Sequence, residues 1–176
     1  MEGTIRTTKP LDYIKERIAS KQMDFERYGF DEDENNAFKI FFDLAQELTR
    51  KEELFNLCVA IPKVVFGCET RLYLTGHAGA ALDMAATTDG LGDADTAALT
   101  GISAPMLLRE TAYALPIRGN HSLIEQLPFQ TKDDLIGALV VEPFAGELAR
   151  RTLFFEKYAN RIGFNLHNRF LVEKNI

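Results

Sequence analysis

The sequence predicts an α+β domain: a single central antiparallel sheet with helices packed on one face, a lid of loop and short helix on the other, and long helices at both ends. Three observations lead to this fold class. Apolar residues recur at helical spacing near both ends of the chain, two strand-like stretches flank the turn-like "GHAG", and "DLIGALVVE" is apolar on both faces. A strand that is apolar on both faces needs cover on both sides of its sheet.

Length and composition fit one domain of ordinary size. The chain has 176 residues, and its hydrophobic fraction of 46% is enough for a core. The net charge of −6 and the absence of a Lys/Arg cluster argue against a nucleic-acid-binding surface. The sequence has no apolar run long enough to span a membrane and no secretory signal, and its two cysteines form no disulfide framework. We therefore expect a cytoplasmic protein without a membrane span.

The spacing of apolar residues in the N-terminal region predicts three helices. Residues Leu11–Tyr28 carry a narrow a/d-type apolar stripe that suits a partner helix. We expect residues 1–30 to form a connector or dimerisation helix and residues 31–176 to form the domain. The acidic run Asp31–Glu34 should start the second helix, where carboxylates face the positive end of the helix dipole. The apolar residues of this second helix are Phe38, Phe41, Phe42, Ala45 and Leu48.

A third helix should follow at once, because "TRKE" has the pattern of a capping box in which Thr49 accepts from the backbone N–H of Glu52. Pro62 lacks a backbone donor, so it should kink or shorten this helix. Gly67 should end it.

The middle of the chain predicts strands and a lid. Glu69–Gly76 and Ala80–Thr87 should pair as a hairpin, and Thr88–Thr100 should form a loop or a loose short helix. Ala104–Ile117 is strand-like from Thr111 onward, although Pro116 makes it a poor central strand to its end. Two further strands are expected in "HSLIEQLPFQ" (121–130) and "DLIGALVV" (134–141).

The last segment, 146–176, predicts a long helix whose stripe includes Phe155, Tyr158, Ile162 and Leu166. At roughly 30 residues it is longer than a compact domain needs. Such an overhang packs against a second copy or passes into another domain. We expect the terminal helices to form a parallel homodimer in which Ile18 and Ile162 lie at the interface. Gly137, in the interior of a strand, suggests a close approach by backbone, side chain or ligand.

The order of these elements resembles a GAF domain, the small-molecule-sensing fold related to PAS. The resemblance covers roughly residues 36–176. It lies in "AFKIFFDLAQELTRKEELFNLCVAIPKVV", in "TRLYLTGHAGAALDMAAT", and in "ALPIRGN", "DLIGALVVEPF" and "FFEKYANRIGFNLHNRFLVEKN". It implies a regulatory role, with no enzymatic activity, upstream of an output module such as a histidine kinase or a diguanylate cyclase, which this chain does not contain. It also implies a ligand pocket between the sheet and the lid, Thr88–Leu108. The matching positions are Tyr73, Met84, Met106, Arg109, Tyr113 and Leu115.

The residues do not identify a cofactor. The bilin-attachment context, the cyclic-nucleotide signature and the reductase cysteine arrangement of GAF subtypes are absent, and Cys58 and Cys68 are best explained as small buried apolar residues. His77, His121 and His167 lack the spacing of a zinc site, whereas a single axial haem ligand remains open. The cofactor is therefore unknown and no metal site is predicted.

Arg109 is the most informative of the candidate positions. It could grip a carboxylate or phosphate, or simply pair with Glu110 or Asp83. Three hypotheses follow: a sensor of a small cytosolic molecule, a ligand-free dimerisation and relay module whose own side chains fill the pocket, and an enzyme that would need a reactive Cys68. The small residues from Gly90 to Ala98 leave room beneath the lid and favour the first.

Overall fold

The computed structural model describes residues 29–75, 82–89, 96–118 and 135–174, with side chains up to residue 166. The chain divides into two compact units, Met1–Asn35 and Asn36–Ile176. The helix expected at 11–28 and the strand expected at 121–130 lie outside the described residues, and the domain boundary expected at residue 30 stays a prediction. The elements in order are α2 (Glu32–Glu47), α3 (Lys51–Phe66), β1 (Glu69–Thr75), β2 (Leu82–Thr87), α4 (Thr96–Leu99), β3 (Met106–Leu107), β4 (Tyr113–Arg118), β5 (Leu135–Glu142), η1 (Leu148–Arg151) and α6 (Thr152–Lys174).

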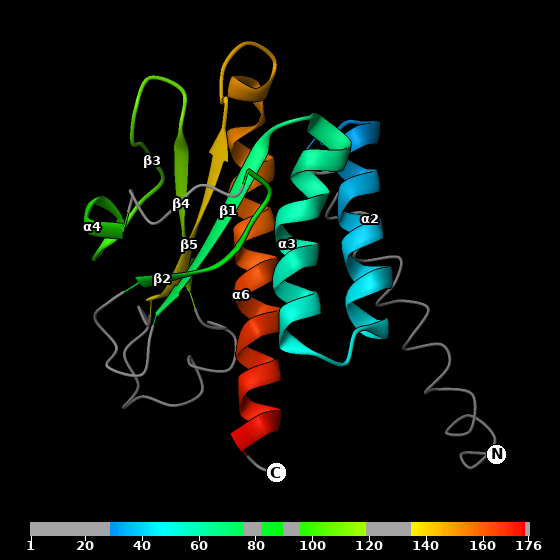
Figure 1. Ribbon diagram of the computed structural model, residues 1–176. Coiled ribbons are helices and arrows are strands. Elements are labelled where there is room, and N and C mark those ends of the chain that lie inside the picture. Colours follow the sequence, from blue (N-terminus) through cyan, green and yellow to red (C-terminus); the bar gives the residue numbers. More distant parts are fainter. Residues whose placement is uncertain (1–28, 76–81, 90–95, 119–134, 175–176) are drawn as a thin grey trace, which may run out of the picture. The chain divides into compact units, whose positions relative to one another are not determined.

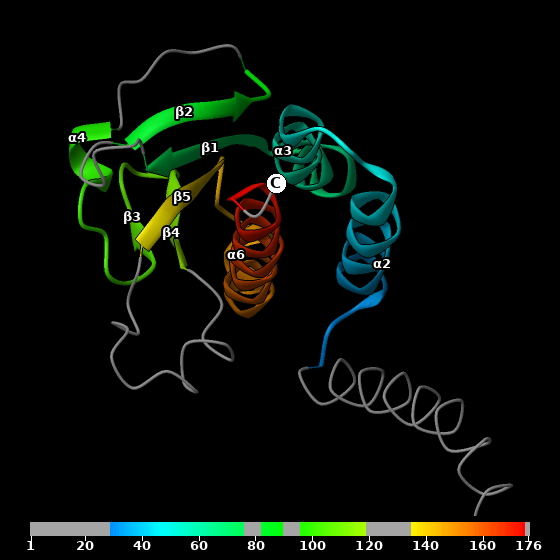
Figure 2. The same ribbon diagram turned by 90° about the horizontal axis from the view of Figure 1, so that it is seen from below.

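The predicted fold class is confirmed. The five described strands form one sheet in the order β2-β1-β5-β4-β3, and every neighbouring pair is antiparallel. Helix α6 packs against β4, and α3 packs against β1. These two helices lie on one side of the sheet and α4 lies on the other (Figures 1 and 2). The segment that contains α4 is therefore the predicted lid.

The start of α2 matches the prediction from the acidic run. Asp31 accepts a hydrogen bond from the N–H of Glu34 (2.9 Å), and Glu34 accepts one from the N–H of Asp31 (3.0 Å). This reciprocal pair is a capping box, which satisfies two backbone donors at the helix start. The acidic run therefore caps a helix.

The predicted start of α3 is wrong by one residue. The residue before the helix is Arg50, with an extended backbone and no side-chain cap, so Thr49 does not occupy the capping position. The helix also continues through Pro62 to Phe66 and is not shortened there. Its end is as predicted: Gly67 adopts the left-handed conformation (φ 75°) and its N–H donates to the carbonyl of Lys63.

A hydrogen bond from a side chain of α6 explains why α3 tolerates Pro62 in its interior. Pro62 has no N–H to donate to the carbonyl of Cys58, four residues earlier. The hydroxyl of Tyr158 donates to that carbonyl at 2.6 Å, and both residues are fully buried. Tyr158 therefore replaces the missing helix hydrogen bond and joins α6 to α3.

The core between the helices and the sheet is aromatic. Phe38 and Phe41 of α2 contact Phe154 and Tyr158 of α6, with ring centroids 4.9 and 5.5 Å apart. The stripe of α6 that we assigned to a dimer seam lies in this core, and Ile162 is 0% exposed. The seam assignment of Ile162 is therefore wrong, because an apolar stripe at helical spacing serves an internal core as well as a partner. The other members of the stripe that are buried in the domain are Phe155, Tyr158, Ala159 and Leu166.

Two further details of the strands match the sequence. Strand β3 pairs only with Tyr113 and Ala114 of β4. Pro116 lies beyond this paired part of β4, so the missing N–H of Pro116 interrupts no ladder on that side. Gly137 is a point of close backbone approach, because a Cβ there would lie 2.1 Å from the carbonyl oxygen of Tyr73.

Candidate functional site on the lid face

The sheet has two faces, which the strand register assigns residue by residue. Arg71, Val140 and Ala114 are register partners on neighbouring strands, as are Tyr73 and Ala138. These side chains share the face that lies under the lid, which we call the lid face. The alternate residues point to α3 and α6 and form the helix face; they include Leu72, Leu115 and Leu139.

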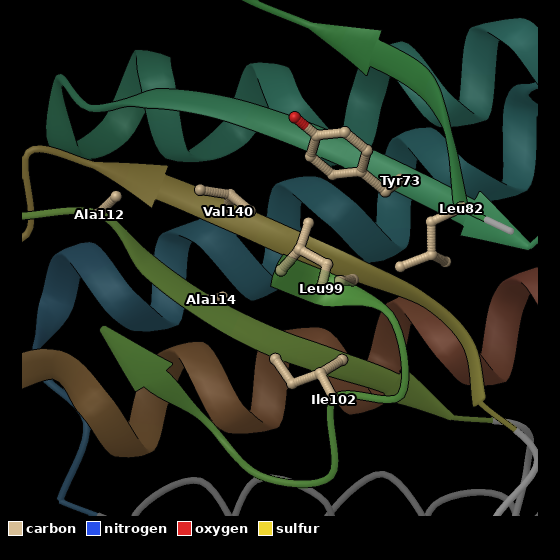
Figure 3. Packing of buried hydrophobic residues seen from close by; sticks show 8 residues of the cluster. Tyr73, Leu82, Leu99, Ile102, Ala112, Ala114 and Val140 are labelled. Carbon is tan, nitrogen blue, oxygen red and sulfur yellow. The ribbon is translucent and has the colours of Figure 1, made fainter. Parts of the chain in front are cut away.

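The lid closes over a floor of small side chains. Leu99, at the end of α4, and Ile102, just after it, extend from the lid onto the sheet (Figure 3). Beneath them, the floor of the lid face is formed by the small side chains of Ala112, Ala114, Ala138 and Val140. These side chains leave space above the strands, which the side chains of the lid fill. Partly buried Met84, Leu108 and Leu135 surround this cluster. Its buried members are Tyr73, Leu82, Leu99, Ile102, Ala112, Ala114, Ala138 and Val140.

A charged cluster lies at one end of the lid face. The guanidinium groups of Arg71 and Arg109 each contact the same carboxylate oxygen of Glu142, Oε2, at 2.9 Å. Arg71 also contacts Asp89, just after β2, with Nε 3.3 Å from Oδ2. The side chain of Arg71 is only 4% exposed whereas that of Arg109 is 42% exposed. Arg71 is therefore a buried residue that holds both carboxylates in place, whereas the guanidinium of Arg109 is accessible to solvent.

The predicted ligand-binding residues divide between the two faces. Tyr73 is buried in the lid-face cluster, Met84 packs against it, and Met106 pairs with Ala114 in the register and is 37% exposed. Arg109 pairs with Glu142, so neither predicted partner, Glu110 nor Asp83, is the one shown. A ligand-binding role for these four stays a prediction.

Tyr113 and Leu115 do not lie where they were predicted. Their register partners are Val141 and Leu139, so both point to the helix face. The ring of Tyr113 stacks on Phe144 at 4.2 Å, and Phe144 in turn contacts Phe155 of α6. Neither side chain lines a pocket under the lid. The error arises because "TAYALPI" is apolar at every position after Thr111, so the sequence does not show which alternate set faces the lid.

Sequence reasoning missed the floor and the charged cluster. Ala112 and Ala114 are small residues at alternate positions, a pattern that marks one face only once the strand register is known. Arg71 is a charged residue within the buried stretch Thr70–Leu74, and a charge at such a position signals a buried ion pair. Its partner Glu142 lies 71 residues away, so local spacing could not identify it.

The two thiols, Cys58 and Cys68, are both buried. Burial raises the pKa of the Cys58 thiol above its ordinary value, and it raises the pKa of the Cys68 thiol to about 11. A high pKa leaves little thiolate at neutral pH, so the reactive Cys68 required by the enzyme hypothesis is not observed. Within the described residues, no group of three or more His, Cys, Asp and Glu side chains could hold a metal ion.

Comparison with solved structures decides the fold. The A. aeolicus nlh2 GAF domain in an inactive state superimposes with a TM-score of 0.56 and 12% identity, over 80% of this chain and 97% of that one. This chain has the GAF fold. A second GAF domain, from a protein described as a putative sensor histidine kinase of Pseudomonas syringae pv. tomato, gives a TM-score of 0.51 and 13% identity, over 88% of this chain and 96% of that one.

No family model matches the sequence, and no curated protein matches it. The GAF assignment therefore depends on the order and pairing of the strands and on the placement of the helices. No helix in the described part of the chain is long and apolar enough to cross a lipid bilayer.

Proposed function

We propose that this chain is a regulatory sensory domain. It binds a small cytosolic molecule between the lid face and the lid, and relays the change through its terminal helices to an output module such as a histidine kinase or a diguanylate cyclase. The observation that carries the proposal is the floor of small residues, Ala112, Ala114 and Ala138, which the lid covers in place of α3 and α6. The GAF fold that the chain shares with the two solved domains supports the same role.

A ligand that binds above this floor must displace the side chains of the lid. Leu99 and Ile102 occupy the space above the floor, so a bound molecule replaces the contacts that they make. Exposing two such side chains costs roughly 3–6 kcal/mol, at about 1.5–3 kcal/mol each. Only a molecule whose affinity for the open lid exceeds its affinity for the closed lid by a comparable amount shifts the equilibrium. This favours a ligand with an apolar body.

The charged cluster suggests the polar end of the ligand. Arg109 is partly exposed and follows directly after the lid, at the end of the sheet where Arg71 and Glu142 pair. A ligand carboxylate could exchange with Glu142 as the partner of Arg109, and arginine binds carboxylates in bidentate geometry. The proposed ligand class is therefore a small carboxylate with an aliphatic or aromatic body.

A second candidate is a ligand-free relay module, and the packing of Leu99 and Ile102 favours it. These two side chains already fill the lid face among the described residues. In that case the domain would transmit changes between its neighbours without a small-molecule signal. The two candidates differ in one measurable property, which is ligand-induced stabilisation.

The test is thermal unfolding in the presence of small carboxylates with apolar bodies, each compared with its methyl ester. The proposal predicts that at least one acid raises the Tm and that its ester does so less. Ala114→Leu fills the floor and should abolish the shift, whereas Leu115→Met on the helix face should retain it. If no acid shifts the Tm of the wild type, the relay module is the better explanation. A shift that Ala114→Leu retains would place binding elsewhere.

A further inference from the structure

Arg118, the last residue of β4, contacts both layers that cover the sheet. Its guanidinium donates to the backbone carbonyl of Ser103, which belongs to the lid and follows Ile102. The carbonyl group of Arg118 lies against α6 on the helix face, at Gly163. Arg118 is therefore hydrogen-bonded to the lid by its side chain and packed against the helix layer by its backbone.

The contact with α6 requires a glycine. A Cβ at Gly163 would lie 2.1 Å from the carbonyl oxygen of Arg118 and 3.2 Å from its carbonyl carbon. Both obstructing atoms are backbone, so they cannot rotate away as a flexible side chain could. Gly163 lets α6 approach the end of β4 at the residue that holds the lid.

We propose that Arg118 is the mechanical link between the lid and the C-terminal helix. Displacement of the lid moves Ser103 and, through the guanidinium, the end of β4. The carbonyl of Arg118 then moves relative to Gly163, and α6 shifts with it. This inference deepens the proposed function, on which its regulatory meaning rests, but the link itself needs no ligand to be tested.

Arg109 provides a matched control, because it also borders the lid. Its guanidinium bonds to Glu142 at the end of β5, whose neighbour Val141 pairs with Tyr113 at the start of β4. Arg109 is therefore attached at the end of β4 opposite to Arg118. Loss of Arg109 should loosen the end of the lid without a change in α6 around Gly163, whereas loss of Arg118 should affect both.

Amide hydrogen exchange, read by mass spectrometry of peptides, tests the link on the full chain. In Arg118→Ala, peptides from the lid (96–108) and from α6 around Gly163 should both exchange about fivefold faster, as expected for the loss of one hydrogen bond. Arg118→Lys, which keeps a cationic donor, should stay closer to the wild type. Arg109→Ala should accelerate exchange in the lid alone, and α3 peptides should be unchanged in all three variants.

Gly163→Ala tests the same link from the helix side. The added methyl group pushes α6 away from the carbonyl of Arg118, and because coupling is reciprocal the lid peptides should also exchange faster. The proposal is overturned if Arg118→Ala changes the lid but leaves α6 as in the wild type, or if it changes neither. It is also overturned if Arg109→Ala accelerates α6 equally, or if Gly163→Ala loosens α6 alone. The absence of a ligand affects none of these outcomes, so a failure here is distinct from a failure of the sensory proposal.

Discussion

The bond between Tyr158 and Cys58 gives a quantitative prediction about how α3 accommodates Pro62. In the wild type the carbonyl of Cys58 has lost its helix donor to the proline and receives the Tyr158 hydroxyl at 2.6 Å in a fully buried site. Tyr158→Phe removes that donor and leaves a buried carbonyl unsatisfied. An unsatisfied buried acceptor costs about 1–3 kcal/mol, and we expect a loss of about 2 kcal/mol in the free energy of unfolding.

Pro62→Ala should weaken this dependence. The substituted alanine supplies an N–H to the carbonyl of Cys58 within the helix, so the carbonyl keeps a partner when Tyr158 is changed. In this background, Tyr158→Phe should cost only about 1 kcal/mol, the ordinary net value of a hydrogen bond. The double-mutant cycle therefore predicts a coupling energy of about 1 kcal/mol between two residues on different helices.

Urea unfolding of the wild type, the two single variants and the double variant measures this coupling from the midpoints, provided that the denaturant slope is unchanged. Tyr113→Phe is the control, because Tyr113 stacks on Phe144 and its hydroxyl makes no hydrogen bond with a described residue; it should change stability by less than about 0.5 kcal/mol. A coupling energy near zero, with Tyr158→Phe equally costly in both backgrounds, would refute the explanation of how α3 tolerates its proline.

Three further predictions concern packing and titration. Gly137→Ala should lower the free energy of unfolding by about 1–3 kcal/mol in urea, because its Cβ meets the carbonyl oxygen of Tyr73; a neutral effect would mean that the two strands are further apart. Ile162→Asp should abolish the cooperative thermal transition followed by circular dichroism, since Ile162 is in the core; a folded variant with an altered oligomeric state would restore the seam assignment. Because folding raises the pKa of Cys68 from 9.0 to about 11, the thiol stabilises the fold below pH 9, and this contribution is lost as the pH rises through 11; Cys68→Ala should show a smaller loss across that range, and an identical pH profile would contradict the burial of the thiol.

The sequence predicted those parts of the fold that depend on local periodicity and backbone chemistry. The stripe of α2, the stop at Gly67 and the burial of both faces of β5 follow from the spacing of apolar residues and from the conformational freedom of glycine. The start of α3 was misplaced because the capping-box pattern begins at Thr49, whereas the residue that precedes the helix is Arg50. A sequence pattern alone does not decide between adjacent positions.

The site was harder to predict because it depends on contacts between distant residues. Tyr113 and Leu115 were assigned to the wrong face, since a strand that is apolar at successive positions does not reveal its orientation. The pairing of Arg109 with Glu142 joins residues 33 positions apart, so nearer carboxylates were the natural candidates. The stripe around Ile162 was interpreted as a dimer seam because the sequence did not show that this stripe would be buried within the domain itself.

Native mass spectrometry of freshly purified protein, with an absorbance spectrum of the same sample, tests the central claim of a ligand beneath the lid most directly. We predict an additional mass in the range of a small organic acid, retained by Leu115→Met and lost in Ala114→Leu. An added mass that persists in Ala114→Leu would contradict the assigned site. A protein of unmodified mass that also gains no thermal stability from any small carboxylate would contradict the sensory proposal and leave the relay module as the function.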